Sequence, residues 1–268
     1  MLDAGVIKIA WYGMMWAMSF MIGYYLISYF FKLEKVPIKW LDSLVIYLVL
    51  GSVIGARLGH CFFYEWDYYT SNPLEIIFIN KGGMASHGGA IGIILVLFFW
   101  SRRVSKRSIL WILDRVVIGV AIAGVLIRFG NFVNQEIVGA PSDSSIAVVF
   151  PRHDQNSEFR ARPYVARHPA QLYEAAAYLP IFIFLLFLYF RQKGRIPLGQ
   201  HFGLFLILIF TARFFIEFIK ENQEAFEDDL TYNMGQLLSI PFVLAGIFFL
   251  IRSRRHKPGP HEEIKEEA

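Results

Sequence analysis

Seven long apolar stretches run along the chain, separated by short polar segments. They lie at residues 11–31, 41–64, 84–100, 109–127, 172–190, 199–219 and 233–251. A helix of about 20 apolar residues crosses the hydrocarbon core of a bilayer. The pattern therefore predicts an all-α integral membrane protein with about seven transmembrane helices. Lys8 is the only basic residue before the first stretch, and no A-x-A-like cleavage site follows the stretch. We therefore expect this helix to remain in the mature protein.

Basic residues gather in every second connection between these stretches. The four groups are Lys32, Lys35 and Lys39; Arg102, Arg103, Lys106 and Arg107; Arg191, Lys193 and Arg195; and Arg252, Arg254, Arg255 and Lys257. Seven spans put all four groups on one side of the membrane, which the positive-inside rule makes the cytoplasmic side. We therefore expect the N-terminus outside and the C-terminus in the cytoplasm.

The same pattern predicts the domain organisation. We expect residues 1–252 to form a single transmembrane domain and residues 253–268 to form a short cytoplasmic tail. Residues 135–169 are too many for a simple connection between two helices, and loops of this length are usually functional or disordered. They predict an extracytoplasmic insertion between the fourth and fifth helices.

Composition supports the membrane class and narrows the functional classes. The chain is 56% hydrophobic and 17% aromatic, which excludes a soluble protein. Its net charge of +4 is poor evidence for nucleic-acid binding, because short basic loops beside anionic lipid already explain it. Cys61 is the only cysteine, so an intrachain disulfide is impossible, and a packing role is expected.

The polar residues within the spans share one depth. With the predicted orientation they fall in the outer half of the membrane: Tyr12, Arg57, His87, the run from Arg128 to Glu136, His168, Arg213 and Glu217. A charged side chain at bilayer depth costs about 2.5–3.5 kcal/mol on insertion scales, so such residues usually face a polar interior or a substrate. Scattered structural ion pairs would not share one leaflet. The convergence predicts a site for a substrate of the outer leaflet.

Several of these residues also allow a structural interpretation. Arg213 and Glu217 lie four residues apart on one helix face, where they can simply neutralise each other. Tyr12 can be an ordinary aromatic of the interfacial belt. Arg57 can extend its guanidinium to the membrane surface. Asp114 and Arg115 are explained by the electrostatics of a helix end.

A glycine-rich segment at residues 81–92 leads into the third apolar stretch. Small residues let membrane helices approach closely, so this segment can be only a turn into a tightly packed helix. Alternatively, Ser86 or a neighbour caps the helix, and its free N–H groups bind a phosphate beside His87.

The segment Arg128-Phe-Gly-Asn-Phe-Val-Asn-Gln-Glu-Ile-Val-Gly139 places a cation, two amides and a carboxylate directly after an apolar stretch. It resembles the signature G-R-x-G-N-F-x-N-x-E-x-x-G of bacterial prolipoprotein diacylglyceryl transferases, with Ile127 in place of the leading glycine. Further matching segments are residues 11–13, 55–59 with 63–64, 82–84 with 87–89, 167–174, 213–217 and 234–241. The resemblance extends from Trp11 to Arg252, and residues 146–162 show no match.

The resemblance implies an enzyme, a transferase acting at the outer face of the bacterial inner membrane. It would move the diacylglyceryl group of phosphatidylglycerol onto the lipobox cysteine thiol of a preprolipoprotein, forming a thioether and releasing glycerol phosphate. The domain at residues 1–252 would then be catalytic. We expect no cofactor, no metal and no nucleic-acid partner, because the substrate itself supplies the nucleophile.

Residue roles follow from this chemistry as hypotheses. His87 is the candidate base for the thiol, since an unperturbed imidazole titrates near pH 6.5. Arg128 and Arg213 would stabilise the phosphate leaving group with bidentate guanidinium contacts, and Glu217 would orient Arg213 or share in proton transfer. The predicted substrate-binding residues are Tyr12, Arg57, Arg128, Asn131, Asn134, Glu136 and Gly139.

Two other functional classes remain open at this point. A seven-helix transporter or channel would line a solute path with its Arg and Glu side chains, and its polar residues would continue through both leaflets. A lipid-binding scaffold would bind phosphatidylglycerol without turnover. Oligomeric state and acyl-chain preference do not follow from the sequence.

Overall fold

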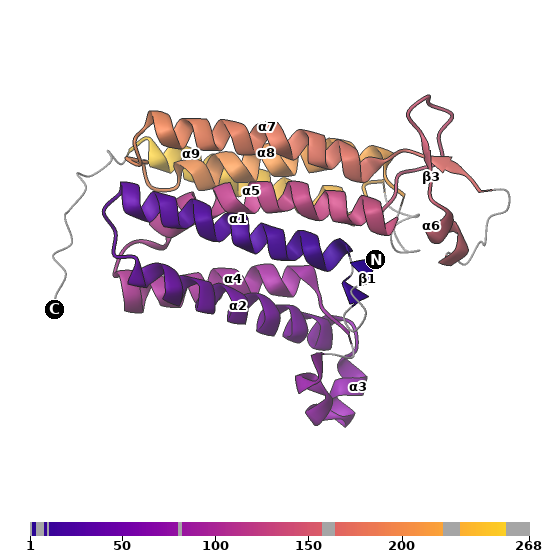
Figure 1. Cartoon of the computed structure of the whole chain (residues 1–268), viewed down its shortest axis with the longest axis horizontal. Helices are drawn as coiled ribbons and strands as arrows, with labels where there is room; N and C mark the ends of the chain where they lie inside the picture. Colours follow the sequence, from indigo (N-terminus) through magenta and orange to yellow (C-terminus); the bar gives the residue numbers. More distant parts are fainter. Residues whose placement is uncertain are drawn as a thin grey trace. The chain divides into compact units, whose positions relative to one another are not determined.

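The computed structural model describes residues 2–3, 8–9, 11–79, 82–156, 164–221 and 231–255, and it is almost entirely helical (Figure 1). The elements in chain order are β1 (Leu2–Asp3), β2 (Lys8–Ile9), α1 (Trp11–Leu33), α2 (Lys39–Phe63), α3 (Trp66–Ser71), η1 (Pro73–Ile77), α4 (Ser86–Trp100), η3 (Ser101–Ser105), α5 (Ile109–Asn134), β3 (Val148–Val149), α6 (Pro151–Asn156), β4 (Ala166–Arg167), α7 (Ala170–Arg191), α8 (Gln200–Ile216), η4 (Glu217–Ile219) and α9 (Met234–Ser253). The strands form two short antiparallel pairs, β1 with β2 and β3 with β4.

Seven helical segments are long and apolar enough to cross a membrane, which confirms the predicted fold class. They are Trp11–Leu33, Lys39–Phe63, His87–Ser105, Ile109–Asn134, Ala170–Arg191, Gln200–Ile219 and Met234–Ser253. The largest shifts from the predicted ends occur in two helices. The fourth span continues to Asn134, because Arg128 and Asn131 end the apolar pattern without breaking the helix. The third span is extended by the π-helical turn η3.

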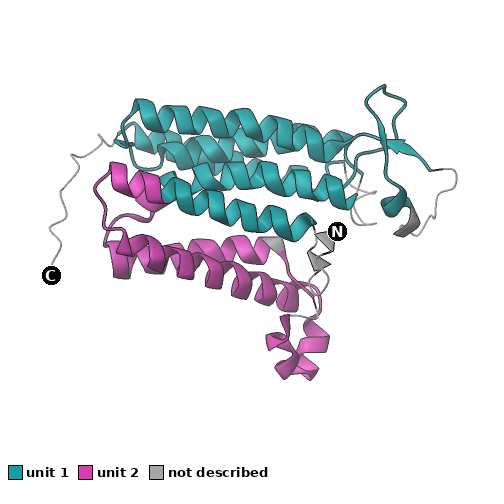
Figure 2. Ribbon diagram, in the orientation of Figure 1, with its two compact units in different colours: residues 1–27, 114–260 teal, residues 28–113, 261–268 magenta. Residues whose placement is uncertain are grey.

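The chain divides into two compact units (Figure 2). Unit 1 comprises Met1–Ile27 and Asp114–Pro260, and unit 2 comprises Ser28–Leu113 and His261–Ala268. Unit 1 holds most of α1 and α5 together with α7, α8 and α9, whereas unit 2 is built mainly from α2 and α4. The tail at residues 256–268, to which most of the predicted cytoplasmic extension belongs, lies outside the described residues.

In unit 1, a buried carboxylate fixes the start of α8. Asp114 has no exposed surface, and it accepts hydrogen bonds from the backbone N–H of Gly199 at 2.7 Å and of Phe202 at 2.9 Å. A carboxylate at a helix N-terminus satisfies donors that have no partner within the helix. The expected helix-end role of Asp114 is therefore confirmed, but the helix that it caps is α8 rather than its own.

In unit 2, α2 and α4 pack backbone against backbone through glycines. A β-carbon at Gly55 would lie 2.5 Å from the carbonyl oxygen of Gly88 and 2.8 Å from Cα of Gly92. A β-carbon at Gly59 would lie 2.6 Å from Cα of Gly88. Such close approach is the known use of small residues between membrane helices. The structural interpretation of the glycines near residue 88 is thus confirmed, and it leaves the role of His87 open.

The outer faces of the long helices carry large apolar side chains. Tyr25, Ile46, Phe187 and Leu244 are each more than half exposed. Large exposed apolar side chains on long helices suit contact with lipid rather than water. Cys61 is buried, in agreement with its expected packing role.

Candidate active site

The polar end of α5 is held together by a chain of hydrogen bonds. Nη1 of Arg128 donates to Oδ1 of Asn131 at 3.3 Å, and Nδ2 of Asn131 donates to Oε1 of Glu136 at 2.7 Å. Arg128 and Asn131 share a helix face because they lie three residues apart. Glu136 follows the end of the helix, so the chain must reverse to bring its carboxylate back.

This reversal uses unusual backbone geometry. Gln135 and Ile137 have positive φ angles of 59° and 58°. A positive φ at a β-branched residue such as Ile137 is an outlier that costs about 1–3 kcal/mol and persists only where the surroundings impose it. Here the N–H of Glu136 donates to the carbonyl of Asn131 at 3.1 Å, and the Gln171 side chain donates to the carbonyl of Glu136 at 2.7 Å. Strain at this turn therefore aims Glu136 at Asn131.

Gly139 joins three segments that are distant in the sequence. Its N–H donates to the carbonyl of His168 at 2.9 Å, and it forms an antiparallel bridge with Lys220. A β-carbon at Gly139 would lie 2.5 Å from the His168 carbonyl oxygen and 2.8 Å from that of Ile219. Only glycine fits this approach, so Gly139 fixes the loop after α5 against the ends of α7 and η4.

Five charged residues form a continuous network beside this loop. Nε of Arg128 lies 3.0 Å from Oε2 of Glu174, and the other oxygen of Glu174 lies 3.9 Å from Nζ of Lys220. Nζ of Lys220 lies 3.1 Å from Oε2 of Glu217, which in turn lies 3.9 Å from Nε of Arg213. The order is thus Arg128, Glu174, Lys220, Glu217 and Arg213.

Exposure divides the network into a buried middle and two accessible ends. The side chains of Glu174, Lys220 and Glu217 are 0%, 1% and 7% exposed, whereas those of Arg128 and Arg213 are 16% and 33% exposed. Three cations face two carboxylates, which leaves one positive charge in excess. Because both accessible ends are guanidinium groups, the network is suited to bind an anion with two or more oxygens.

The start of α9 leaves room for the Glu217 carboxylate. A β-carbon at Gly235 would lie 2.5 Å from Cδ of Glu217. Asn233 and Gln236 form a capping box that fixes the first turn of α9. Gly235 therefore lies beside the carboxylate in a defined helix turn.

Tyr12 and Asn134 complete the predicted residues of unit 1. A β-carbon at Gly130 would lie 3.1 Å from Cδ2 of Tyr12, so the tyrosine ring packs on the polar turn of α5. The Tyr12 ring also meets Trp16 edge to face at 6.3 Å between centroids. Asn134 is the last residue of α5 and is half-buried.

In unit 2, Arg57 is buried against a loop. Its guanidinium donates to five backbone carbonyls, those of Glu75, Ile76, Phe78, Gly82 and Gly83, at distances from 2.7 to 3.4 Å. Its Cζ also lies 4.9 Å from the centroid of the Tyr69 ring. Burial raises the pKa of Tyr69 above its ordinary value, and the charge of Arg57 opposes this shift. The side chain of Arg57 thus shapes the loop that leads to α4.

His87 is the second residue of α4 and is exposed. Its ring meets the rings of Phe63 and Tyr64 at 5.3 and 5.7 Å between centroids. The residue that caps α4 is Ala85, and its side chain accepts no hydrogen bond. Ser86 is thus the first residue of α4 rather than its cap, and Ala85 cannot cap the helix with its side chain. The side chain of Ser86 lies outside the described residues. An exposed imidazole at the positive end of a helix is accessible to a substrate.

Two members of the charged network were not among the predicted site residues. Glu174 ends a segment that matches the family pattern, yet nothing local marks its carboxylate as functional. Lys220 follows Glu217 at a spacing of three, which is a signal for pairing that sequence reasoning overlooked. Within the described ranges, no group of three or more His, Cys, Asp or Glu residues is suited to hold a metal ion.

Comparison with known proteins identifies the family. A family model described as prolipoprotein diacylglyceryl transferase matches residues 1–252. The phosphatidylglycerol–prolipoprotein diacylglyceryl transferase of Tolumonas auensis is 43% identical over 257 residues, which cover 96% of each chain. The enzyme of the same name from Chloroherpeton thalassium is 43% identical over 253 residues, covering 94% of this chain and 91% of the relative. That of Porphyromonas gingivalis is 43% identical over 251 residues, covering 91% and 89%. With a match that spans all seven apolar helices and every segment of the charged network, the chain belongs to the prolipoprotein diacylglyceryl transferase family.

Proposed function

We propose that the protein transfers the diacylglyceryl group of phosphatidylglycerol to the lipobox cysteine thiol of preprolipoproteins. The thiolate sulfur attacks the glycerol carbon that carries the phosphate, and a C–S bond forms as the C–O bond breaks. The electron pair leaves on the phosphate oxygen, and the thiol proton passes to a base. The products are a thioether-linked lipoprotein precursor and glycerol phosphate, so no oxidant or metal is required for balance.

The charged network is the observation that carries this proposal. A phosphodiester with one negative charge becomes a phosphomonoester as the bond breaks, so negative charge grows on the phosphate oxygens. Groups already in place where this charge develops lower the barrier, because they need no reorganisation during the reaction. Arg128 and Arg213 end a network with one excess positive charge and remain partly exposed. They are the proposed phosphate ligands.

The buried members of the network act as positioning residues. Glu174 holds Nε of Arg128 at 3.0 Å and Asn131 accepts from its Nη1 at 3.3 Å, and together these two contacts would orient the guanidinium toward the phosphate. Lys220 lies between Glu174 and Glu217 and keeps the two carboxylates from facing each other without a cation. Glu217, whose Oε2 lies 3.9 Å from Nε of Arg213, would orient that guanidinium.

Groups at the end of α5 would bind the polar part of the substrates. Asn131 and Glu136 are joined by a 2.7 Å hydrogen bond and lie next to Arg128, where glycerol hydroxyls or peptide groups can exchange hydrogen bonds with them. Gly139 would act through the loop that it fixes. Tyr12 and Asn134 remain proposed substrate-binding residues at the same turn.

His87 remains the proposed base for the thiol. A free thiol has a pKa near 8.5, so only a few per cent is thiolate at neutral pH, and a base close to it raises this fraction. The exposed position of His87 supports the role. For Arg57, five hydrogen bonds to carbonyls support a positioning role for the loop before α4 in place of direct contact with substrate.

The protein is a multi-pass membrane protein. The basic loops support an inner-membrane orientation in which the polar end of α5 faces the periplasm. Phosphatidylglycerol and the precursor would then meet the enzyme in the outer leaflet of that membrane.

Reconstitution of the full-length protein tests the proposal. Vesicles of phosphatidylglycerol and phosphatidylethanolamine are incubated with a lipobox peptide, and the peptide mass and released glycerol phosphate are measured. We expect one diacylglyceryl group per peptide and an equal amount of glycerol phosphate. A peptide with serine in place of the lipobox cysteine and vesicles without phosphatidylglycerol are the controls. Lipid binding without product would indicate a scaffold, and solute flux without product would indicate a transporter; either result would overturn the proposal.

A further inference from the structure

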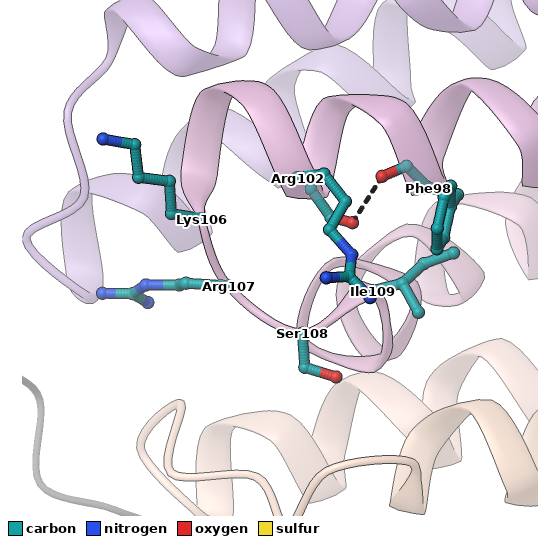
Figure 3. A pocket seen from close by; sticks show the side chains of 7 residues that line it. Phe98, Arg102, Lys106, Arg107, Ser108 and Ile109 are labelled. Atoms are coloured by element: carbon teal, nitrogen blue, oxygen red, sulfur yellow. Dashed lines mark hydrogen bonds between the residues drawn. The ribbon is translucent and has the colours of Figure 1, made fainter.

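A cavity of about 460 Å³ lies in unit 2 (Figure 3). It is at the C-terminal end of α4, whereas His87 lies in the first turn of that helix. The cavity is lined by Phe98, Ser101, Arg102, Lys106, Arg107, Ser108 and Ile109. Three of these seven residues are cations, and none of the seven is acidic. We propose that this cavity binds the phosphate of an anionic phospholipid in the leaflet opposite to the proposed active site.

The backbone around the cavity is opened by irregular structure. Residues Ser101–Ser105 form a π-helical turn, and Lys106 follows with a left-handed φ of 53°. Single π-helical turns are rare and occur frequently at functional sites. Lys106 and Arg107 extend in the same direction from this turn, while Arg102 folds beside Ile109 (Figure 3).

The start of α5 adds further polar groups. The hydroxyl of Ser108 accepts a hydrogen bond from the N–H of Leu110 at 3.3 Å, and its own hydrogen stays available for a ligand. α5 has no acidic residue in its first turn, so the positive end of the helix dipole is not offset there by its own side chains. A phosphate in the cavity would meet this helix end as well as the cations.

Apolar surface beside the cavity favours a lipid over a free anion. Phe98 lines the cavity and is 42% exposed. Leu95 and Ile91 precede it at helical spacing on the same face of α4 and are each 53% exposed. The cations therefore continue into an apolar strip along which an acyl chain can lie.

The cavity lies at the basic end of α4, where aromatic rings pack against one of its cations. Cζ of Arg107 lies 4.6 Å from the centroid of the Trp111 ring and 5.8 Å from that of Trp40. Nε1 of Trp100 donates to Oγ of Ser43 at 2.9 Å at the same end of α4. Short basic loops flank membrane spans on the cytoplasmic side, and basic pockets between helices on that side bind anionic headgroups.

Native mass spectrometry of the full-length protein in detergent tests the inference. The probe is dioleoyl phosphatidic acid, titrated into wild type, the double variant Arg102→Gln/Lys106→Gln and the control Arg254→Gln/Arg255→Gln. The control removes two exposed charges at the end of α9, and neither residue lines the cavity. Each basic residue near an anionic surface contributes a roughly fivefold effect, so the cavity variant should bind its first lipid about 10- to 30-fold more weakly. The control should change by less than twofold.

Three outcomes would overturn the inference. Equal weakening in both variants would mean that the loops attract anionic lipid only through their summed charge. Displacement of the lipid by millimolar inorganic phosphate would mean that the cavity binds a free anion. Equal binding of dioleoyl phosphatidylcholine would mean that the phosphate contacts carry no selectivity for anionic lipid. Arg102 and Lys106 are both exposed, so the substitutions should leave the fold intact.

Discussion

Nε of Arg128 lies 3.0 Å from Oε2 of Glu174, a carboxylate with no exposed surface. A charge buried in this way is stable only with a partner, and removal of one partner of a buried pair typically costs about 3–5 kcal/mol. Arg128 neutralises Glu174, and in the proposed mechanism its guanidinium has a second, separable task, which is to bind the phosphate. The two tasks respond differently to substitution.

Arg128→Lys should fold but lose most of its activity. An ammonium keeps the charge beside Glu174 but lacks the planar fork that holds two phosphate oxygens. Loss of one donor to a developing anion typically lowers the rate by ~10²–10³. Turnover is measured at matched membrane levels, with Arg254→Lys as the control and Arg128→Ala as the variant expected to destabilise the protein. Turnover like that of wild type in Arg128→Lys would remove Arg128 from the phosphate site.

Lys220→Met should unfold much more easily than wild type. The substitution leaves Glu174 and Glu217 buried without the cation that lies 3.9 and 3.1 Å from them, at a cost of about 3–5 kcal/mol. Lys220→Arg retains the charge and should recover most of this loss. Thermal unfolding in detergent gives the comparison. If Lys220→Met proves as stable as wild type, the two carboxylates are not held by Lys220.

His87→Gln should change the pH dependence of the rate. Without a base, the reaction depends on the fraction of substrate thiolate, which rises about tenfold per pH unit until the thiol pKa near 8.5. The turnover rate of the variant should therefore be far below that of wild type at pH 7, and the difference should shrink steeply as the pH approaches 8.5. His60→Gln, which removes a neighbouring imidazole that pairs with Glu65 at 3.5 Å, is the matched control. A pH profile parallel to that of wild type would exclude His87 as the base.

Cys61→Ala should keep most of its activity. Cys61 is 2% exposed, so the change leaves a small cavity that costs of the order of 1 kcal/mol. The transferred group ends on the substrate thiol, and direct displacement needs no thiol from the enzyme. Turnover and melting temperature are measured together. A stably folded variant without turnover would instead indicate a covalent enzyme intermediate.

A reporter fused after Arg255 should lie in the cytoplasm, because the four basic groups lie on the side where this helix end emerges. A reporter that works only in the cytoplasm should therefore be active at this position. A second fusion, after Ser144 in the loop between α5 and α7, should lie in the periplasm. A reporter that works only in the periplasm should therefore be active at that position. Exposed loop tips tolerate insertion, and Ser144 is exposed. The reverse pattern would refute both the predicted orientation and the proposed periplasmic site.

Local sequence patterns were sufficient for the fold class and for the grouping of some residues of the candidate site. Apolar length predicted seven helices, and the residues between Arg128 and Gly139 do lie together at the end of α5. Glu174 was missed because its contact with Lys220 joins the start of α7 to the end of η4, and no periodicity within one helix reports such a contact. Lys220 did carry a local signal, its spacing of three from Glu217. The sequence did not decide where the Arg57 side chain points, for a similar reason. Its partners are backbone carbonyls of a loop, which have no signature in the sequence.

The glycine contact between α2 and α4 permits a single register. Gly88 and Gly92 lie against the row of Gly51, Gly55 and Gly59. One helical turn beyond this row, at either end, come Tyr47 and Phe63. A slide of α4 by one turn in either direction would drive an aromatic side chain into a backbone that leaves no space even for a methyl group. The position of the His87 imidazole along the α2–α4 pair is therefore set by steric exclusion between the two helices. It does not depend on any hydrogen bond to His87.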